Sequence, residues 1–301
     1  MLTPSHTTSF IKDIEQSVNI ALCEDLGISS IGQLNSQLDI TAELIPENSM
    51  AVATIITREN CVVCGVEWVN QVFKVLDNAY QQTKPTTITW FVEDGDTVKA
   101  NTPLFEISGN SRILLTGERS ALNFLQLLSG TATTTQHYVA CLANTKTKLL
   151  DTRKTIPGLR SAQKYAVKCG GGVNHRIGLF DAFLIKENHI AACGSIEQAI
   201  TTARSNHSNK TVEVEVESIN ELTQALNAKA DIIMLDNFSP EMIEQAVELR
   251  EKITQGQAKL EASGNMTLAT LTQYAKAGVD FISVGALTKH VNAIDLSMRL
   301  K

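Results

Sequence analysis

The sequence lacks long apolar runs, and its basic residues do not outnumber its acidic ones. No stretch approaches the roughly 18 consecutive apolar residues that a membrane-spanning helix needs, so we expect no contact with a membrane. Residues 1–16 contain no apolar signal core, and we therefore expect a cytoplasmic protein. The 26 Lys and Arg residues against 32 Asp and Glu residues give a formal charge of −6, which argues against a nucleic-acid-binding surface.

Cysteine is scarce and scattered. Of the six cysteines, Cys61 and Cys64 have the C-x-x-C spacing that zinc sites and redox pairs use. No second pair completes a zinc set, and two valines separate the two thiols. We interpret this pair as cysteines that a strand buries, and expect reduced thiols.

The second half of the chain alternates short apolar runs with helical patterns. Six strands are predicted at Lys148–Leu150, Ala182–Ile185, Val212–Val216, Ile232–Leu235, Lys259–Glu261 and Phe281–Val284. Helices are predicted after three of them, at Ile219–Asn227, Pro240–Ile253 and Leu268–Ala277. Repeated βα units predict a parallel sheet with helices outside it. Only 155 residues remain from Thr147 onward, against about 250 in a closed eight-unit barrel, so an incomplete barrel of about six strands is expected. An open doubly wound sheet is the alternative, but no G-x-G-x-x-G turn follows the first strand.

The first half predicts a separate α+β sandwich domain. Its expected elements are a helix over 9–25, strands at 50–57 and 61–63, a helix over 66–76, and a hairpin of 87–92 and 102–107 about an Asp-Gly turn. A helix over 111–129 should end at Gly130, and another is expected over 136–142. We predict an N-terminal domain of residues 1–127, a barrel of residues 128–285, and a C-terminal segment of residues 286–301.

Charged and small residues gather where the predicted barrel strands end, which is where α/β barrels hold their active sites. Cationic residues follow the first two strands and the loop between them: Arg153, Lys154, His175, Arg176 and Lys186. Because the protein as a whole is acidic, this local density indicates a site for a small polyanion.

Carboxylates and glycine turns follow the later strands. Glu215 and Asp236 end the third and fourth strands, and Glu213, Glu215 and Glu217 share one strand face. The segments Ser263–Asn265 and Ser283–Ala286 expose backbone N–H groups before helices, an arrangement that favours phosphate. Aligned carboxylates beside a phosphate cradle suit a polyphosphate that carries Mg²⁺.

Several segments, in this order and spacing, resemble the quinolinate phosphoribosyltransferase family. They are ALCEDLG, LDIT, TRENCVVCG and GERSALNFLQLLSGTAT in the first half, and DTRKTIPGLRSAQKYAVKCGGGVNHR, LFDAFLIKENH, VEVEVES, DIIMLDNFSP, EASGNMT and SVGALT in the second. The resemblance covers nearly the whole chain. It implies transfer of a ribosyl 5-phosphate from phosphoribosyl pyrophosphate (PRPP) to quinolinate with decarboxylation, giving nicotinate mononucleotide, pyrophosphate and CO₂ for NAD synthesis. It also implies Mg²⁺, a C-terminal segment that returns to the N-terminal domain, and a homodimer in which Arg119 reaches the neighbouring subunit's site.

The resemblance also assigns roles to residues. It implies that the dicarboxylate is bound by Arg119, Arg153, Lys154, His175, Arg176 and Lys186, with Thr152 among the substrate-binding residues. It places Glu215 and Asp236 near the ribose and the metal-bound pyrophosphate, with indirect metal contact. The phosphate cradle would consist of Ser263, Gly264, Asn265, Ser283, Gly285 and Ala286. The predicted catalytic residues are Lys154, Lys186, Glu215 and Asp236.

Three other functions remain compatible with the sequence. One is an aldolase-type barrel with Lys186 as a Schiff-base lysine. Another is a related pyridine or base phosphoribosyltransferase of the type linked to molybdenum transport. The third is a non-catalytic protein that binds a metabolite and regulates another process.

Overall fold

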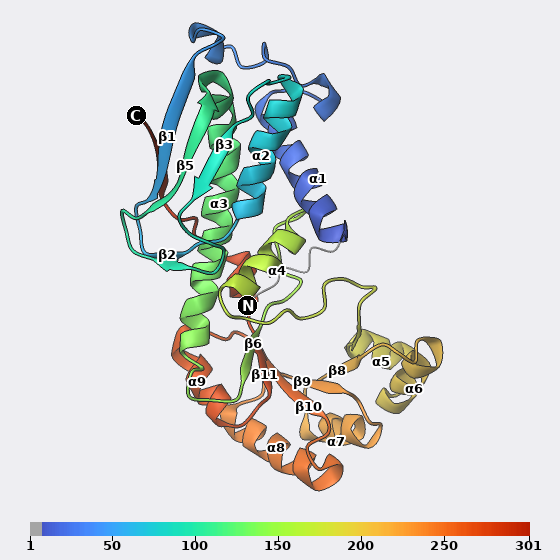
Figure 1. The fold of residues 1–301 in the computed structure, drawn as a ribbon. Helices are drawn as coiled ribbons and strands as arrows, with labels where there is room; N and C mark the ends of the chain where they lie inside the picture. Colours follow the sequence, from blue (N-terminus) through green and yellow to red (C-terminus); the bar gives the residue numbers. More distant parts are fainter. Residues whose placement is uncertain (1–7) are drawn as a thin grey trace. The chain divides into compact units, whose positions relative to one another are not determined.

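The computed structural model describes residues 8–301, which form two compact units (Figure 1). Unit 1 contains residues up to 134 together with 156–171 and 290–301, and unit 2 contains 135–155 and 172–289. Among the described residues, none of the helices has the length and hydropathy that a membrane span requires.

Unit 1 contains an antiparallel four-stranded sheet in the order β12-β1-β5-β3. The strands of this unit are β1 (Met50–Thr57), β2 (Cys61–Val62), β3 (Thr87–Trp90), β4 (Thr97–Val98), β5 (Pro103–Asn110) and β12 (Leu296–Leu300). β2 and β4 form a separate antiparallel pair. Because β12 pairs with β1, the end of the chain completes the sheet of this unit, as the family resemblance implied.

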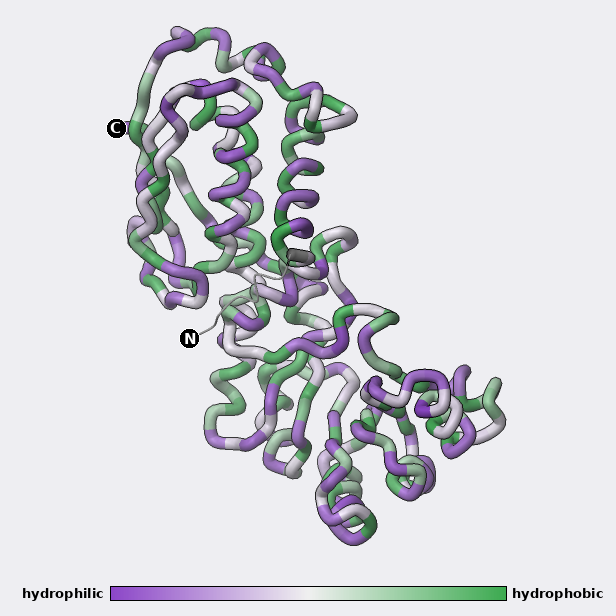
Figure 2. The backbone as a smooth tube through the Cα atoms, turned by 45° about the vertical axis from the view of Figure 1, so that its right-hand side comes forward, coloured by the Kyte–Doolittle hydropathy of each residue, from purple (hydrophilic) through white to green (hydrophobic). Residues whose placement is uncertain are grey.

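The helices of unit 1 bury their apolar faces together with the sheet. They are α1 (Thr8–Asp25), α2 (Val66–Ala79), most of α3 (Ser111–Ala140) and α4 (Arg160–Cys169), with two 3-10 turns at Ile31–Gln33 and Ala42–Leu44. Figure 2 shows hydrophilic and hydrophobic residues alternating along these helices. Phe10, Trp68 and Tyr165 connect α1, α2 and α4, with ring centroids 5.2–5.8 Å apart. This aromatic contact explains why α4 belongs to unit 1, whereas the sequence analysis placed it within the predicted barrel segment. The predicted domain boundaries themselves stay predictions.

Gly130 does not end α3, so the prediction of two helices over 111–142 was wrong. The helix runs without interruption from Ser111 to Ala140. A Cβ at Gly130 would lie 2.1 Å from the carbonyl oxygen of Asn292. The glycine therefore permits a close approach of the C-terminal segment within unit 1, and this packing accounts for a residue that in sequence resembles a helix stop.

The predicted hairpin forms, but its loop is longer than expected. β3 pairs with β5 in the register Trp90↔Phe105. The intervening residues 91–102 leave the sheet, form β4, and carry Asp94 to the start of α2. The Asp-Gly pair belongs to this excursion, where Gly95 has φ of 100°.

Unit 2 is an open barrel of six parallel strands in the order β6-β11-β10-β9-β8-β7, which confirms the predicted fold class. Its strands are β6 (Lys148–Leu150), β7 (Phe183–Ile185), β8 (Val212–Val216), β9 (Ile232–Asp236), β10 (Lys259–Ser263) and β11 (Phe281–Ser283). Its helices are α5 (Glu187–Cys193), α6 (Ile196–Asn206), α7 (Ile219–Asn227), α8 (Pro240–Thr254), α9 (Leu268–Lys276) and α10 (Ala286–Lys289). Of these, α5 and α6 were not predicted.

Strand register places the chemically important residues of unit 2 on one face of the sheet. Glu215 pairs with Met234, Met234 with Glu261, and Asp236 with Ser263. Residues two apart on a strand share a face, so the same face carries Glu213 and Ser283 as well. Four neighbouring strands, β8, β9, β10 and β11, therefore supply one row of polar side chains.

Candidate functional site

The loop of residues 173–176 is fixed to the end of β6 by Asp151. This aspartate is fully buried and accepts hydrogen bonds from Asn174 Nδ2 at 2.6 Å and from the His175 backbone N–H at 2.9 Å. Sequence reasoning noted Asp151 only as a strand end. Its carboxylate positions the loop that presents the next two predicted residues.

Arg153 and Arg176 carry buried N–H groups suited to an anion. The Nε atoms of both arginines are buried, and no hydrogen-bond acceptor for them lies within the described residues. Arg176 Nη1 donates to the carbonyl of Ala182 at 3.2 Å, which holds part of its guanidinium. Burial lowers the pKa of Arg176, and the Arg153 guanidinium lowers it further, while Glu213 and Asp181 oppose the shift. Two neighbouring guanidinium groups of this kind would gain most from a carboxylate or phosphate partner.

Lys186 and Glu215 form the ion pair that the register of β7 and β8 brings together. Lys186 Nζ lies 2.5 Å from Glu215 Oε2, with 43% of the lysine side chain and 12% of the glutamate side chain exposed. Asp236, at the end of β9, accepts a 2.7 Å hydrogen bond from Asn237 Nδ2. One partly exposed cation and two carboxylates thus lie at the ends of consecutive strands.

The turns after β10 and β11 are tightly packed. Gly264 has φ of 113°, and a Cβ there would lie 2.3 Å from Asn237 Oδ1. A Cβ at Gly285 would lie 3.1 Å from Lys154 Cδ. The Lys154 carbonyl accepts a 2.9 Å hydrogen bond from Thr288 Oγ1, and its N–H donates to Thr152 Oγ1 at 3.1 Å. These contacts bring Thr152, Lys154 and the Gly285 turn together. A side chain at Gly264 would clash with Asn237, and one at Gly285 would be a tight fit against Lys154.

A buried cluster that the sequence analysis did not single out lies on the inner strand face. His175 Nε2 lies 2.9 Å from Glu213 Oε2 and 3.5 Å from Glu261 Oε2. Burial raises the pKa of Glu261 to about 8, and Glu213 contributes to the rise, whereas His175 and Ser283 oppose it. One signal in the sequence could have revealed this cluster. An acidic residue stands inside each of two apolar strand patterns, Glu213 in VEV and Glu261 in LEA.

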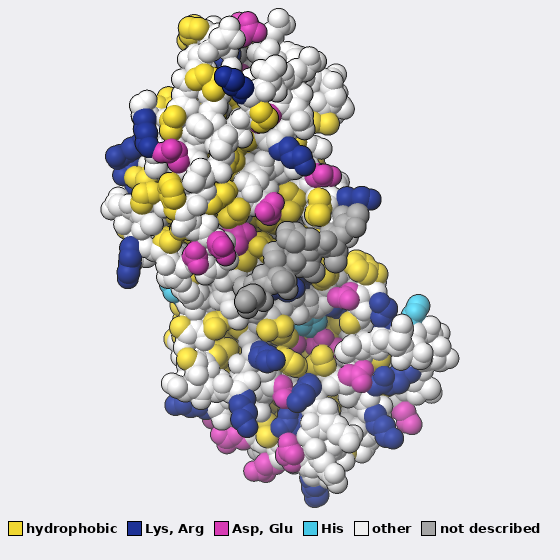
Figure 3. Space-filling view, in the orientation of Figure 1, with side chains coloured by type: hydrophobic (Ala, Val, Ile, Leu, Met, Phe, Trp, Pro, Cys, Tyr) yellow, Lys and Arg dark blue, Asp and Glu magenta, His cyan; other side chains and the backbone are white. Residues whose placement is uncertain are grey.

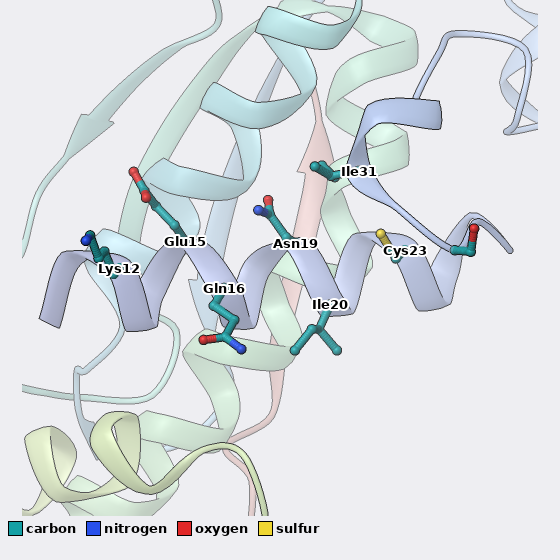
Figure 4. A pocket seen from close by; sticks show the side chains of 8 residues that line it. Lys12, Glu15, Gln16, Asn19, Ile20, Cys23 and Ile31 are labelled. Atoms are coloured by element: carbon teal, nitrogen blue, oxygen red, sulfur yellow. The ribbon is translucent and has the colours of Figure 1, made fainter. Parts of the chain in front are cut away.

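Arg119 belongs to unit 1, where it lines a cavity of about 410 Å³. Residues of α1, α3 and the 157–159 loop surround this cavity, with Glu24, Asp25 and Phe124 among them. A second hollow in unit 1, of about 570 Å³, lies along α1 (Figure 4) and is lined by Lys12, Glu15, Gln16, Asn19, Ile20, Cys23, Ser29 and Ile31. None of the predicted site residues lines this second hollow.

Unit 1 also contains a buried cluster of Cys64, Asp94 and Cys169. Burial raises the pKa of Cys64 and of Asp94. Cys61, the other residue of the C-x-x-C pair, lies 3.7 Å from the Thr57 hydroxyl and is not part of this cluster. On the face drawn in Figure 3, basic and acidic side chains are interspersed over unit 2 rather than separated into one basic surface.

Comparisons with known proteins agree with this architecture. Residues 39–129 match the family model of the quinolinate phosphoribosyl transferase N-terminal domain, and residues 131–299 match that of the C-terminal domain. The chain is 38% identical to a probable carboxylating nicotinate-nucleotide pyrophosphorylase of Bacillus subtilis over 95% of this chain and 92% of that protein. It is 40% identical to the Mycobacterium leprae enzyme over 87% and 91% of the two chains. The structure of the Francisella tularensis nicotinate-nucleotide pyrophosphorylase superposes with a TM-score of 0.86, at 50% identity and 97% coverage of both chains. The chain therefore belongs to the quinolinate phosphoribosyltransferase family.

Proposed function

We propose that this chain transfers the 5-phosphoribosyl group of PRPP to the ring nitrogen of quinolinate with loss of one carboxylate. The products are nicotinate mononucleotide, pyrophosphate and CO₂, on the de novo route to NAD. The observation that carries the proposal is the row of Lys186, Glu215 and Asp236 beside two arginines with buried, unpartnered Nε–H groups. Family membership supports the same reaction.

Quinolinate is a dianion, so its binding needs several cations. Arg153 and Arg176 bind its carboxylates, and Arg guanidinium groups can grip each carboxylate with two parallel hydrogen bonds. Lys154 and Lys186 add charge without a fixed geometry. Because PRPP is also anionic, these cations lower the cost of bringing two like-charged substrates together.

In the transfer step, the lone pair of the ring nitrogen forms a bond to the ribose C1. The bond from C1 to the pyrophosphate oxygen breaks, and the oxygen keeps the electron pair. Positive charge develops on the ribose, and Glu215 and Asp236 stabilise it electrostatically from adjacent strand ends. The phosphate groups lie against the turns of Ser263–Asn265 and Ser283–Ala286, where Gly264 and Gly285 allow the backbone to approach.

Decarboxylation follows on the enzyme. The electron pair of the broken carbon–carbon bond is stabilised by the positively charged ring nitrogen, and a proton then replaces CO₂ on the ring carbon. CO₂ leaves as a neutral molecule, and Lys154, Lys186 or His175 stabilises the negative charge that develops on the ring carbon. Normal turnover and unchanged quinolinate affinity in both Lys154→Ala and Lys186→Ala would rule out the two lysines.

The residues near the proposed phosphate site fit Mg²⁺ held mainly by the substrate. Glu215 and Asp236 offer hard oxygen donors, but each already has a protein partner in Lys186 or Asn237. Mg²⁺ commonly binds through one or two carboxylates, water and substrate phosphates. When bound, the ion would neutralise charge that the leaving pyrophosphate acquires.

We further propose that the enzyme is a homodimer in which Arg119 completes the site of the partner subunit. Mixing inactive Arg119→Ala and Lys186→Ala chains tests this arrangement. Half of randomly assorted dimers are mixed, and each holds one intact site of two, so about a quarter of wild-type activity should return. No recovery, although subunits exchange, would contradict a shared site.

The function is tested by assaying purified protein with Mg²⁺, PRPP and carboxyl-labelled quinolinate, with nicotinate as a parallel acceptor. CO₂ release that depends on PRPP, together with nicotinate mononucleotide, is the expected result. Turnover with nicotinate alone would instead indicate another phosphoribosyltransferase, and tight PRPP binding without turnover would indicate a regulator. Neither alternative is supported by the names of the relatives above, and the pairing of Lys186 with Glu215 does not favour a Schiff-base role. The cytoplasmic location stays a prediction that cell fractionation can test.

A further inference from the structure

Both ring nitrogens of His175 lie close to polar atoms of the protein. Nδ1 accepts a 2.8 Å hydrogen bond from the backbone N–H of Arg176, so the proton of the neutral ring lies on Nε2. Nε2 in turn faces Glu213 at 2.9 Å and Glu261 at 3.5 Å. The ring thus lies between the backbone of Arg176 and two buried carboxylates.

Glu213 and Glu261 come from strands on either side of β9 and meet below the ring. Their exposed fractions are 3% and 0%, so water does not screen their charges. Two adjacent buried carboxylates cannot both keep a full negative charge without cations beside them. The pair is thus suited to carry one negative charge, and Glu213 is the member that interacts electrostatically with Arg176.

The contacts connect this pair to the arginine that faces the substrate. Glu213 and Glu261 lie against Nε2 of His175, and Nδ1 of the same ring accepts from the Arg176 N–H. Asp151 accepts from Asn174 and from the His175 N–H in the same loop. A bidentate contact needs its guanidinium placed to within a fraction of an ångström, and a misplacement of about 1 Å can cost as much as about a hundredfold in rate.

We propose that Glu213 and Glu261 are positioning residues for quinolinate, which fix the His175 ring so that it orients Arg176. This inference rests on the proposed function, because it names the part of that site through which the buried pair acts. His175 thus also serves quinolinate binding through Arg176.

The test measures KM for quinolinate, KM for PRPP and kcat in Glu213→Gln, His175→Ala and the double variant. Glu213→Gln should raise KM for quinolinate about tenfold and leave KM for PRPP nearly unchanged. Loss of a negative charge alone would lower KM for a dianion, since the site becomes more positive. A rise is therefore the sign of lost positioning, which a pure charge effect cannot produce.

The double variant decides whether the residues act in one chain of contacts. Its KM for quinolinate should equal that of the weaker-binding single variant, because both substitutions break the same connection. Multiplied effects, or an unchanged or lower KM in Glu213→Gln, would overturn the proposal. Glu261→Ala should also raise this KM, and Glu261→Gln, whose amide can still donate to Glu213, should restore most of the affinity.

The controls separate this inference from the proposed function and from folding. Glu244→Gln, an exposed glutamate on α8, should match wild type in every parameter. If the wild type does not release CO₂ from quinolinate, the proposed function fails. If the wild type releases CO₂ but the effects of the two single substitutions on KM for quinolinate multiply in the double variant, only this inference fails. Thermal unfolding checks each variant. Should Glu213→Gln not fold, Glu213→Asp, which keeps the charge but shortens the side chain, should show the same rise.

Discussion

The two buried clusters, one in each unit, differ in how the protein satisfies their polar atoms. In unit 1, Asp94 accepts hydrogen bonds from the backbone N–H groups of Gly65 and Val66 and from the Tyr165 hydroxyl, at 2.8–3.2 Å. In unit 2, Glu213 and Glu261 both face Nε2 of His175, at 2.9 and 3.5 Å. Both clusters contain residue types that bind metals. The difference teaches that proximity of such residues does not by itself define a site. In unit 1, hydrogen bonds within the fold occupy the oxygens of Asp94, whereas in unit 2 the two carboxylates lie against the loop that carries His175 and Arg176.

The largest effect should come from Lys186→Ala in unit 2. Removal of the cation opposite Glu215 should lower kcat/KM for quinolinate by about a hundredfold or more, the size typical of losing one electrostatic contact to the reacting groups. Steady-state kinetics measure it. Lys252→Ala, an exposed lysine on α8, is the matched control and should keep full activity. Equal activity in the two variants would contradict a catalytic role for Lys186.

Asp94→Ala should affect the stability of unit 1 and not its chemistry. It leaves two backbone N–H groups at the start of α2 and one buried hydroxyl without their acceptor, which should cost about 2–3 kcal/mol of unfolding free energy. Urea denaturation measures the loss. KM and kcat of the folded protein should stay within about twofold of wild type. Tyr165→Phe removes only one of these bonds and should cost about 1 kcal/mol.

The pKa of Glu261 predicts a pH dependence of stability that originates in unit 2. Its pKa is raised to about 8 in the folded chain, so above the ordinary value near 4.5 the folded state holds a proton that the unfolded state has released. This contribution to stability is complete below pH 4.5 and declines toward pH 8, by at most about 1.4 kcal/mol per pH unit.

Urea midpoints at pH 5 and pH 8 test this dependence. The Glu261→Gln variant should lose less stability between the two pH values than wild type, because its amide does not titrate. Glu244→Gln should retain the wild-type slope. Parallel slopes in wild type and Glu261→Gln would show that Glu261 ionises normally when folded.

The smallest effect should follow metal addition or removal at the cluster of Cys64, Asp94 and Cys169. Because the Asp94 oxygens already accept three hydrogen bonds, we expect zinc or a chelator to shift the unfolding midpoint of a Mg²⁺-free sample by less than about 1 °C. Differential scanning calorimetry would detect a larger shift. Clear stabilisation by zinc would remove the distinction between the two clusters.

Much of unit 2 could be predicted because its signals are local. The strand at Val212–Val216 and the helix at Ile219–Asn227 have the predicted bounds, and the other strands agree within two residues. Short apolar runs that end in polar residues identify buried parallel strands. The helices α5 and α6 were missed because ENHIAAC and the segment after Ser195 carry few large apolar residues.

Features that depend on contacts distant in sequence could not be predicted. Nothing near Gly130 indicates that the carbonyl of Asn292 will occupy the space of its side chain. Likewise, Glu261 is recognisable as an acid in an apolar strand, but its contact with His175 depends on strand order. The cationic residues at the strand ends could be named from the sequence, whereas the positions of the two His175 nitrogens beside the Arg176 backbone and Glu213 required coordinates.

β6 is an edge strand of the open barrel, and Val173 forms a backbone bridge to it within the described residues. Val173 forms an isolated parallel bridge with Leu150, donates to the Leu149 carbonyl at 2.8 Å, and accepts from the Asp151 N–H. It also begins the loop that carries His175 and Arg176. If that loop detaches, unpaired backbone groups of β6 become available to strands of other chains. Any ligand that holds the loop in place should therefore also suppress self-association on heating, so that solubility and occupancy of the site vary together.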